Sequence, residues 1–238
     1  MKLLLLLTLL LTVSLSAKDL DFTRELNLDA DGLKKFSIDC GAGSLDVKGT
    51  SGKDIKVDVE IIIEGVNDRK AEQILEESLR LSLEKSGSRA ELICKFDNLS
   101  WTHALRGISI RADIIVDMPA GLALEVEDGS GSIEISGIEN DVQIDDGSGS
   151  IFVEDIDGGL EIEDNSGNVT VRKITGNIFI EDGSGDMDIE DVKGNVKIDD
   201  GSGSITVNRV TEDVKIKEDG SGGVSVRNIE GRVYRDDD

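Results

Sequence analysis

Hydrophobic and polar positions follow one pattern that recurs through the second half of the chain. Asp-Gly-Ser-Gly, once varied to Asp-Asn-Ser-Gly, begins at residues 128, 146, 164, 182, 200 and 219, a spacing of 18 residues with a last step of 19. Counted from each of these Asp residues, positions six, eight and eleven are apolar in all six copies, and positions fifteen and seventeen are apolar in the first five. Apolar residues at every second position predict a strand with one buried face. Each copy is therefore expected to hold two short strands.

This repetition predicts a β-solenoid. One copy buries too few apolar side chains to offset the conformational entropy lost when its residues become ordered. If each copy forms one coil, the coils stack at about 4.8 Å, identical positions form continuous aliphatic columns, and every strand edge pairs with the next coil. A β-sandwich of hairpins is the alternative, but it does not require identical columns in successive copies. We therefore expect an all-β repeat protein, β-roll-like or β-helix-like, with 18 residues and two short strands in each coil.

Glycine marks both corners of the expected coil. The Gly-Ser-Gly run forms one corner, and position thirteen, which is Gly or Asn in five of the six copies, forms the other. These two residue types tolerate positive φ, which other residues avoid. At position thirteen they would allow the backbone of the corner to take positive φ.

The first half of the chain extends the pattern and then interrupts it. Phe36, Ile38 and the segment Cys40 to Val47 repeat the late apolar pair, a glycine corner and the early pair, which predicts a first coil near residues 33–59. Leu124 and Val126 return to positions fifteen and seventeen. Between them we expect a helix that caps or flanks the solenoid, at 68–77, and strands at 79–83, 90–96 and 108–116. The expected organisation is an N-terminal part at 18–126 and a regular solenoid at 127–238.

The first 17 residues have the layout of a secretory signal peptide. Lys2 precedes an apolar stretch from Leu3 to Val13, and small residues follow at Ser14, Ser16 and Ala17. A transmembrane anchor is the alternative, but the stretch is shorter than the roughly 20 residues of a spanning helix. Lys18 stands where a lipid-modified cysteine would follow. We expect export with cleavage near Ala17, and no transmembrane or lipid anchor afterwards.

Composition and cysteine content limit the partners. With 50 Asp and Glu against 26 Lys and Arg, the formal net charge is −24, which repels nucleic acid and anionic lipid surfaces and favours cations and basic partners. The two cysteines, Cys40 and Cys94, have no metal-ligand spacing. In an oxidising compartment they are candidates for a disulfide, and free buried thiols are the alternative.

Acidic residues gather at the Gly-Ser-Gly corner. Positions nine and ten alternate in sign between copies, as in Asp191 and Arg209, so their charges compensate. Position eighteen, by contrast, is acidic through Glu218, and position one is always Asp, so like charges stack along this edge. The edge is a candidate Ca²⁺ site, with a solvated acidic face as the alternative. Its candidate ligands are Glu127, Asp128, Asp145, Asp146, Glu163, Asp164, Glu181, Asp182, Asp199 and Asp200.

Catalytic chemistry is not expected. Carboxylates recur with the repeat instead of converging on one loop, so we expect no enzyme and no cofactor beyond the Ca²⁺ hypothesis. The single histidine, His103, has no serine or cysteine constellation beside it, which favours a loop residue over a catalytic base. Trp101, the single tryptophan, lies in the same segment as either a packing residue or a ligand anchor.

The sequence resembles the bacterial putative-adhesin family, a domain of unknown function in exported and envelope proteins. The resemblance covers most of the chain after residue 17, and it rests on the early coil at 41–47, on Met118-Pro119-Ala120-Gly121 after a strand, and on Ser-Gly-Ser-Ile corners at 130–133, 148–151 and 202–205. It implies an exported, non-enzymatic, adhesin-like structural or interaction module. We expect the regular face to bind an envelope protein or polysaccharide in the periplasm, or else outside the cell or on its surface. A calcium-responsive repeat protein is the alternative function.

Overall fold

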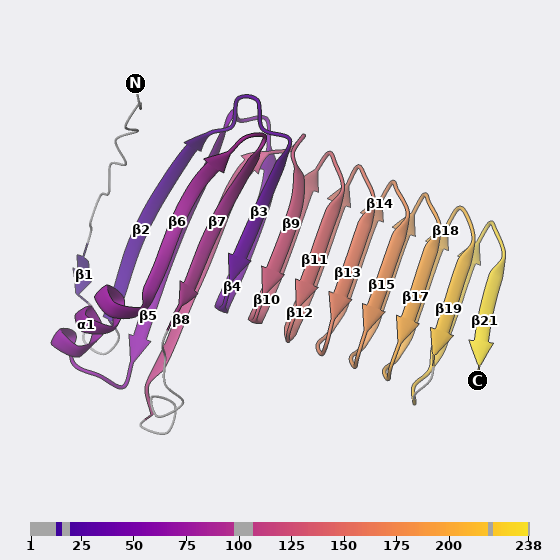
Figure 1. Ribbon diagram of the computed structural model, residues 1–238. Helices are drawn as coiled ribbons and strands as arrows, with labels where there is room; N and C mark the ends of the chain where they lie inside the picture. Colours follow the sequence, from indigo (N-terminus) through magenta and orange to yellow (C-terminus); the bar gives the residue numbers. More distant parts are fainter. Residues whose placement is uncertain (1–12, 16–19, 98–106, 219–220, 238) are drawn as a thin grey trace.

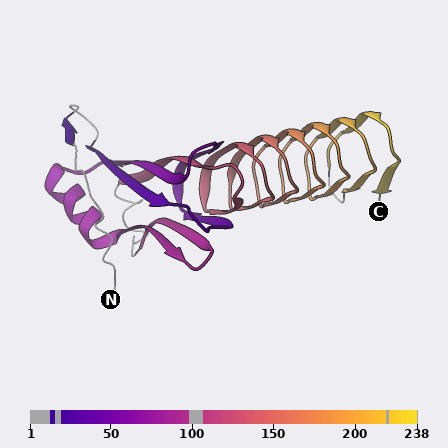
Figure 2. The ribbon, with the colours of Figure 1, turned by 90° about the horizontal axis from the view of Figure 1, so that it is seen from above.

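Two long sheets lie face to face along the molecule and enclose one hydrophobic core (Figures 1 and 2). The structure, a computed structural model, describes residues 13–15, 20–97, 107–218 and 221–237. Within these residues sheet A has eleven strands and sheet B has ten. In spatial order, sheet A consists of β1 (Val13–Leu15), β2 (Leu20–Asp29), β5 (Asp54–Glu64), β8 (Ser109–Pro119), β4 (Ala42–Thr50), β10 (Ser130–Ile138), β12 (Gly149–Ile156), β14 (Val169–Ile174), β16 (Met187–Val192), β18 (Ile205–Val210) and β20 (Val224–Ile229). Sheet B consists of β6 (Leu79–Ser86), β7 (Arg89–Phe96), β3 (Lys35–Cys40), β9 (Ala123–Asp128), β11 (Val142–Asp146), β13 (Leu160–Asp164), β15 (Ile178–Asp182), β17 (Val196–Asp200), β19 (Val214–Glu218) and β21 (Val233–Asp237).

Successive coils pair in parallel at the register of the repeat. In sheet A, Ile133 of β10 pairs with Ile151 of β12, which pairs with Val169 of β14. In sheet B, Ile144 of β11 pairs with Ile162 of β13 in the same way. Each copy thus forms one coil with one strand in each sheet (Figure 1). The predicted β-solenoid is confirmed, since a sandwich of hairpins would pair neighbouring copies antiparallel.

The apolar columns form the core. From β9 to β19, the side chains at positions six, eight, eleven, fifteen and seventeen are at most 3% exposed. Each fully buried aliphatic side chain stabilises the fold by roughly 1.5–3 kcal/mol relative to exposure. Because every coil buries its side chains against the coils on either side, the stability of each coil depends on its neighbours.

The corner opposite the Gly-Ser-Gly run differs from the expectation. Positive φ, between 54° and 62°, occurs at position ten, in Asp155, Lys173, Asp191, Arg209 and Asn228. Position thirteen needs glycine for another reason, because a Cβ on Gly176 would lie 2.3 Å from the carbonyl oxygen of Gly158 in the previous coil. Position thirteen does not use the positive φ that glycine would allow, and the requirement for glycine there comes from close contact between coils.

An inserted segment lengthens the solenoid beyond its first coil. That coil ends with β4 at Thr50, earlier than the expected residue 59, and β5 turns back to pair antiparallel with β2 and β8. Because β7 pairs with β3 and β8 pairs with β4, the inserted strands lie on the outer side of the first coil. The chain re-enters the regular coils at β9, where Leu124 pairs with Phe36 and Val142, as the sequence predicted.

The helix α1 (Asp68–Ser78) lies at the N-terminal end of the solenoid (Figures 1 and 2). It begins where the sequence predicted, because the side chain of Asn67 accepts a hydrogen bond from the backbone N–H of Lys70 at 3.0 Å. Its buried side chains are Ala71, Ile74 and Leu75, which join the core. The helix therefore caps the solenoid, which is one of the two placements expected from the sequence.

Two sequence predictions concern segments that the structure describes only in part or not at all. The signal peptide at 1–17 lies outside the described residues except for Val13–Leu15, which form β1 beside β2. Trp101 and His103 also lie outside the described residues. No helix in the described part of the chain is long and apolar enough to cross a membrane. The signal peptide stays a prediction.

Candidate functional site

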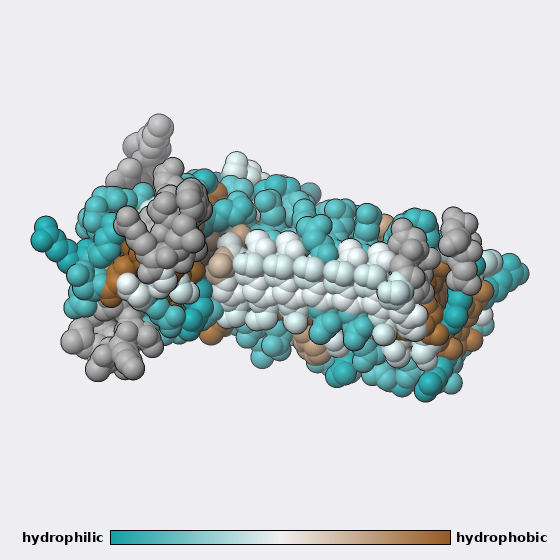
Figure 3. All heavy atoms as spheres, turned by 90° about the horizontal axis from the view of Figure 1, so that it is seen from below, coloured by the Kyte–Doolittle hydropathy of each residue, from teal (hydrophilic) through white to brown (hydrophobic). Residues whose placement is uncertain are grey.

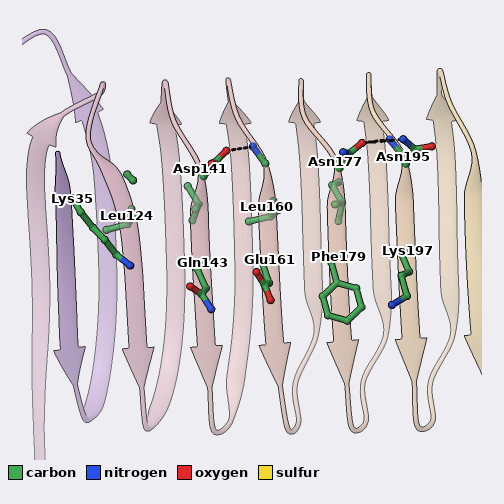
Figure 4. Close-up of a pocket in the computed structure, with 14 residues that line it drawn as sticks. Lys35, Leu124, Asp141, Gln143, Leu160, Glu161, Asn177, Phe179, Asn195 and Lys197 are labelled. Carbon is green, nitrogen blue, oxygen red and sulfur yellow. Dashed lines mark hydrogen bonds between the residues drawn. The ribbon is translucent and has the colours of Figure 1, made fainter.

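The outer face of sheet B carries a shallow groove along the solenoid axis, over β3, β9, β11, β13, β15 and β17 (Figure 4). Its volume is about 770 Å³. The polar and aromatic side chains that line the groove stand at positions fourteen and sixteen of the repeat. These positions alternate with the buried positions fifteen and seventeen, so their side chains point outward. We call this surface the side groove and define it by Lys35, Asp141, Gln143, Glu161, Asn177, Phe179, Asn195 and Lys197.

Side chains at position fourteen hydrogen-bond to the next coil and so hold the wall of the side groove. The Asp141 carboxylate accepts from the Gly159 N–H at 2.7 Å (Figure 4). The Asn177 side-chain oxygen accepts from the backbone N–H and the side-chain amide of Asn195, at 2.9 and 3.0 Å (Figure 4). Gly159 has no side chain, so this row is interrupted between Asp141 and Asn177, and backbone forms part of the floor there.

Phe179 supplies the aromatic surface of the side groove. Its ring is half-buried, and the Lys197 ammonium lies 4.4 Å from the ring centroid, which is a cation–π contact. An aromatic face surrounded by a few placed polar groups is typical of ligand sites. Sequence reasoning missed this surface, although a Phe at position sixteen, where Gln143, Glu161 and Lys197 stand in other copies, is a signal that could have indicated it.

The ten acidic candidates lie at the Gly-Ser-Gly corner, which follows the lower edge of the molecule in Figure 1 and shows as a pale stripe of glycine and serine in Figure 3. They form two separate columns. Position eighteen is mostly exposed, whereas position one faces the interior, with Asp146, Asp164 and Asp182 0%, 4% and 2% exposed. Among the described residues, no three His, Cys, Asp or Glu side chains are placed to hold a metal ion together. Calcium binding stays a hypothesis.

Each inward Asp caps the corner with one carboxylate oxygen. Oδ1 of Asp146, Asp164 and Asp182 accepts from the backbone N–H two residues later, at 3.2, 3.0 and 3.1 Å, as an Asx turn requires. Oδ2 of each is buried without a hydrogen-bond partner in the described part of the chain. Burial, followed by the charge of neighbouring Asp residues, raises the pKa of Asp146 and Asp182 to about 6.

We expect mild acid to stabilise the fold. The pKa of Asp146 and Asp182 rises from 3.8 to about 6 on folding, so the folded state binds protons more tightly than the unfolded state. This contribution is full below about pH 4 and is lost as the pH rises through about 6, and it amounts to about 1–3 kcal/mol for each residue. The charged groups that face these carboxyls, Asp128, Asp164 and Asp200, are all acidic. The melting temperature at constant ionic strength should therefore be higher near pH 5 than near pH 7.5.

Matched variants separate this effect from general charge. Asp182→Asn, which mimics the protonated acid, should raise the melting temperature near pH 7.5 and reduce its pH dependence. Asp188→Asn on the exposed face of β16 should leave the pH dependence unchanged. A wild-type protein that melts at a lower temperature near pH 5 would contradict the buried-acid interpretation.

Charges at positions nine and ten compensate across coils, as predicted. The Lys173 ammonium lies 2.6 Å from the Glu154 carboxylate, and Arg209 donates to Asp191 at 2.9 Å. The Arg209 guanidinium lowers the pKa of Asp191. These pairs are exposed, so their contribution to stability is small.

The last coil corrects the expected acidic column. Val214 and Ile216 keep the core register, and the additional residue of the 19-residue step lies after Glu218. Lys217 therefore pairs with Asp199 at position eighteen, and its Nζ contacts both carboxylate oxygens of Asp199 at 3.2 and 3.3 Å. The prediction that position eighteen stays acidic through Glu218 was wrong.

The two cysteines continue the position-one column toward the N-terminal end. Cys40 of β3 pairs in register with Cys94 of β7, and its thiol donates to Asp128 Oδ1 at 3.2 Å. Both are buried free thiols in this structure, and burial raises the pKa of Cys94 to about 12. Neighbouring parallel strands place such Cα atoms about 4.8 Å apart, which a disulfide can span. The disulfide stays a prediction.

Fold and site together define a class of protein, a parallel β-solenoid whose outer surfaces are ladders of polar side chains. The family model of Toastrack DUF4097 matches residues 33–233, and the chain belongs to this family. The resemblance to the putative-adhesin family, a domain of unknown function, is confirmed.

Several solved structures resemble the chain. A putative adhesin from Bacteroides fragilis NCTC 9343 is 15% identical, with 93% of this chain and 98% of that chain covered and a TM-score of 0.41. A putative lipid binding protein from Parabacteroides distasonis ATCC 8503 is 14% identical, with coverage of 91% and 96% and a TM-score of 0.47. A putative cell adhesion protein from Clostridium sporogenes ATCC 15579 is 14% identical, with coverage of 90% and 99% and a TM-score of 0.35. No curated protein matches the chain.

Proposed function

We propose that the protein is an exported, non-enzymatic, adhesin-like interaction module of the cell envelope, and that its side groove binds an extended polysaccharide. The observation that carries this proposal is the groove itself, in which hydrogen-bonding side chains repeat along the axis on both sides of the Phe179 ring. Sugar rings combine hydroxyl groups with apolar C–H faces, so they suit a surface of amides and carboxylates around an aromatic ring.

The geometry of the solenoid supports an extended ligand. The coils repeat at about 4.8 Å, so the side groove offers polar groups at regular intervals over the four coils that contain β11, β13, β15 and β17. The net charge of −24 disfavours nucleic acid and anionic lipid as partners. The signal peptide predicted at 1–17 supports export, with the periplasm as the first expected location.

The experiment compares two phenylalanines on opposite faces. Phe179→Ala removes the aromatic surface of the side groove, whereas Phe152→Ala removes a half-buried phenylalanine on the outer face of sheet A, where Arg172 lies 5.9 Å from its ring centroid. The purified protein is mixed with an insoluble polysaccharide fraction from the host envelope, and the amount of protein that sediments with this fraction measures binding. Phe179→Ala should weaken binding about tenfold or more, as the loss of a central aromatic contact does.

Phe152→Ala should leave this binding within about twofold of the wild-type value. Equal losses in the two variants would mean that the side groove is not the binding surface. Absence of wild-type binding to any envelope polysaccharide fraction would overturn the choice of ligand.

A further inference from the structure

The exposed acidic column at position eighteen is occupied by an ammonium group at each end. At one end, the Nζ of Lys95 contacts the carboxylates of Asp39 and Glu127, the latter at 3.6 Å. At the other end, the Nζ of Lys217 contacts both carboxylate oxygens of Asp199, at 3.2 and 3.3 Å. The protein's own lysines thus show that this column accepts primary ammonium groups.

The middle of the same column lacks such partners. Asp145, Glu163 and Glu181 stand in register on β11, β13 and β15, and all three are exposed. Within the described residues no lysine or arginine forms a salt bridge with them. Three like charges at intervals of about 4.8 Å therefore repel one another without compensation.

These three carboxylates border a groove of about 420 Å³, which we call the corner groove and define by Asp145, Glu163, Asp164, Asn165, Glu181, Asp182, Gly183, Asp199, Gly201 and Lys217. Its floor carries no side chain at Gly183 and Gly201, where a Cβ would lie 2.5 or 2.4 Å from a carbonyl oxygen of the previous coil, whereas Asn165 has a side chain at the equivalent position. The groove therefore follows the solenoid axis for several coils, with carboxylates along one side.

A second layer of negative charge lies beneath the corner groove. Asp164 and Asp182 line it, and they are only 4% and 2% exposed. Oδ1 of each is used by the Asx turn, and Oδ2 has no hydrogen-bond partner in the described part of the chain. Buried carboxylates without a compensating group are costly, and a bound cation above them would offset that cost.

We propose that the corner groove binds a linear aliphatic polyamine. Its ammonium groups contact Asp145, Glu163 and Glu181, as Lys95 and Lys217 contact the carboxylates at the two ends of the column. Short alkyl spacers between the ammonium groups match the spacing of the coils, so one extended molecule reaches successive carboxylates. A single metal ion fits less well, because no three acidic side chains in the described residues converge on one point. This site lies at the Gly-Ser-Gly corner, whereas the side groove lies on the outer face of sheet B, and the proposal does not depend on the proposed function.

The test measures binding of spermine to the purified full-length protein by isothermal titration calorimetry at constant ionic strength. The double variant Glu163→Gln/Glu181→Gln removes two carboxylates of the corner groove without changing their shape. The control, Glu134→Gln/Asp188→Asn, removes two exposed carboxylates from the outer face of sheet A and lowers the negative charge equally. Spermine affinity should fall about tenfold in the first variant, since each exposed ammonium–carboxylate contact contributes a few fold. It should stay within about twofold in the control.

Other results would overturn the proposal. Equal losses in the two double variants would show that spermine responds only to net charge. Calcium chloride that binds as tightly as spermine, and competes with it, would favour the calcium hypothesis instead. Tetralysine that binds while spermine does not would identify the corner groove as a peptide surface. Because the readout is spermine binding, failure here would leave the polysaccharide test of the side groove unaffected.

Discussion

Gly167→Ala should destabilise the protein by about 2–6 kcal/mol, because the coils cannot stack around an added methyl group. Gly167 has φ of 151°, and a Cβ there would lie 1.4 Å from the carbonyl oxygen of Gly149 in the previous coil. Gly149 stands in the same relation to Gly131, so the contact is part of a glycine column and neither coil can shift alone. Chemical denaturation followed by circular dichroism gives the free energy of unfolding that checks this value.

A second glycine provides the matched control. Gly121 lies before the regular coils, and a Cβ there would meet no atom within 4 Å. Gly121→Ala should therefore change the free energy of unfolding by less than about 0.5 kcal/mol, as surface substitutions usually do. If both variants were destabilised to a similar extent, the effect of Gly167→Ala would come from the lost backbone flexibility of glycine and not from the close contact between coils.

Ile189→Asp should be at least as damaging, with an expected loss of several kcal/mol. Ile189 is 0% exposed at position eight of a central coil, between Val171 and Val207 of the adjacent coils. A carboxylate there has only aliphatic neighbours in its column, unlike Asp182, whose Oδ1 accepts a backbone hydrogen bond at the corner. The melting temperature by differential scanning calorimetry measures the effect.

The adjacent residue separates burial from position in the sequence. Asp188 is exposed on the outer face of β16, so Asp188→Lys should stay within about 0.5 kcal/mol of the wild-type stability. If both substitutions lowered the melting temperature equally, the assignment of inward and outward faces would be wrong.

The regular solenoid could be predicted from the sequence because identical positions recur at the period of one coil. Apolar residues at positions six and eight, such as Ile133 and Ile135, alternate with polar residues, and stacking is the arrangement that buries all copies of them together. The start of α1 was predictable for a similar reason, since the Asn67 cap and the buried face of the helix are local features.

The binding surfaces were less accessible to sequence reasoning, because they depend on which side chains neighbouring coils place together. The acidic corner was predicted as a set of residues, but its division into an exposed and a buried column was not. Asp146 and Asp145 are adjacent in the chain and face opposite sides of the strand. The side groove was missed, since it requires Asn177, Phe179 and Lys197 from two coils and the missing side chain of Gly159 from a third.

The sequence by itself determined the class of fold, the columns that form the core, the corner with its acidic residues, and the presence of an insertion that interrupts the coils. These features follow from the local periodicity of apolar and polar residues, which recurs in every copy of the repeat. Only the tertiary structure decided which glycines are required for contact and which residue takes positive φ, as Gly176 and Lys173 show. It also decided that the additional residue of the 19-residue step lies after Glu218, which keeps Lys217 at the end of the acidic column, and that Cys40 meets both Cys94 and Asp128. The physical reason is that such contacts join residues one or more coils apart, and their geometry is set by the stacking of coils and not by the pattern within any one of them.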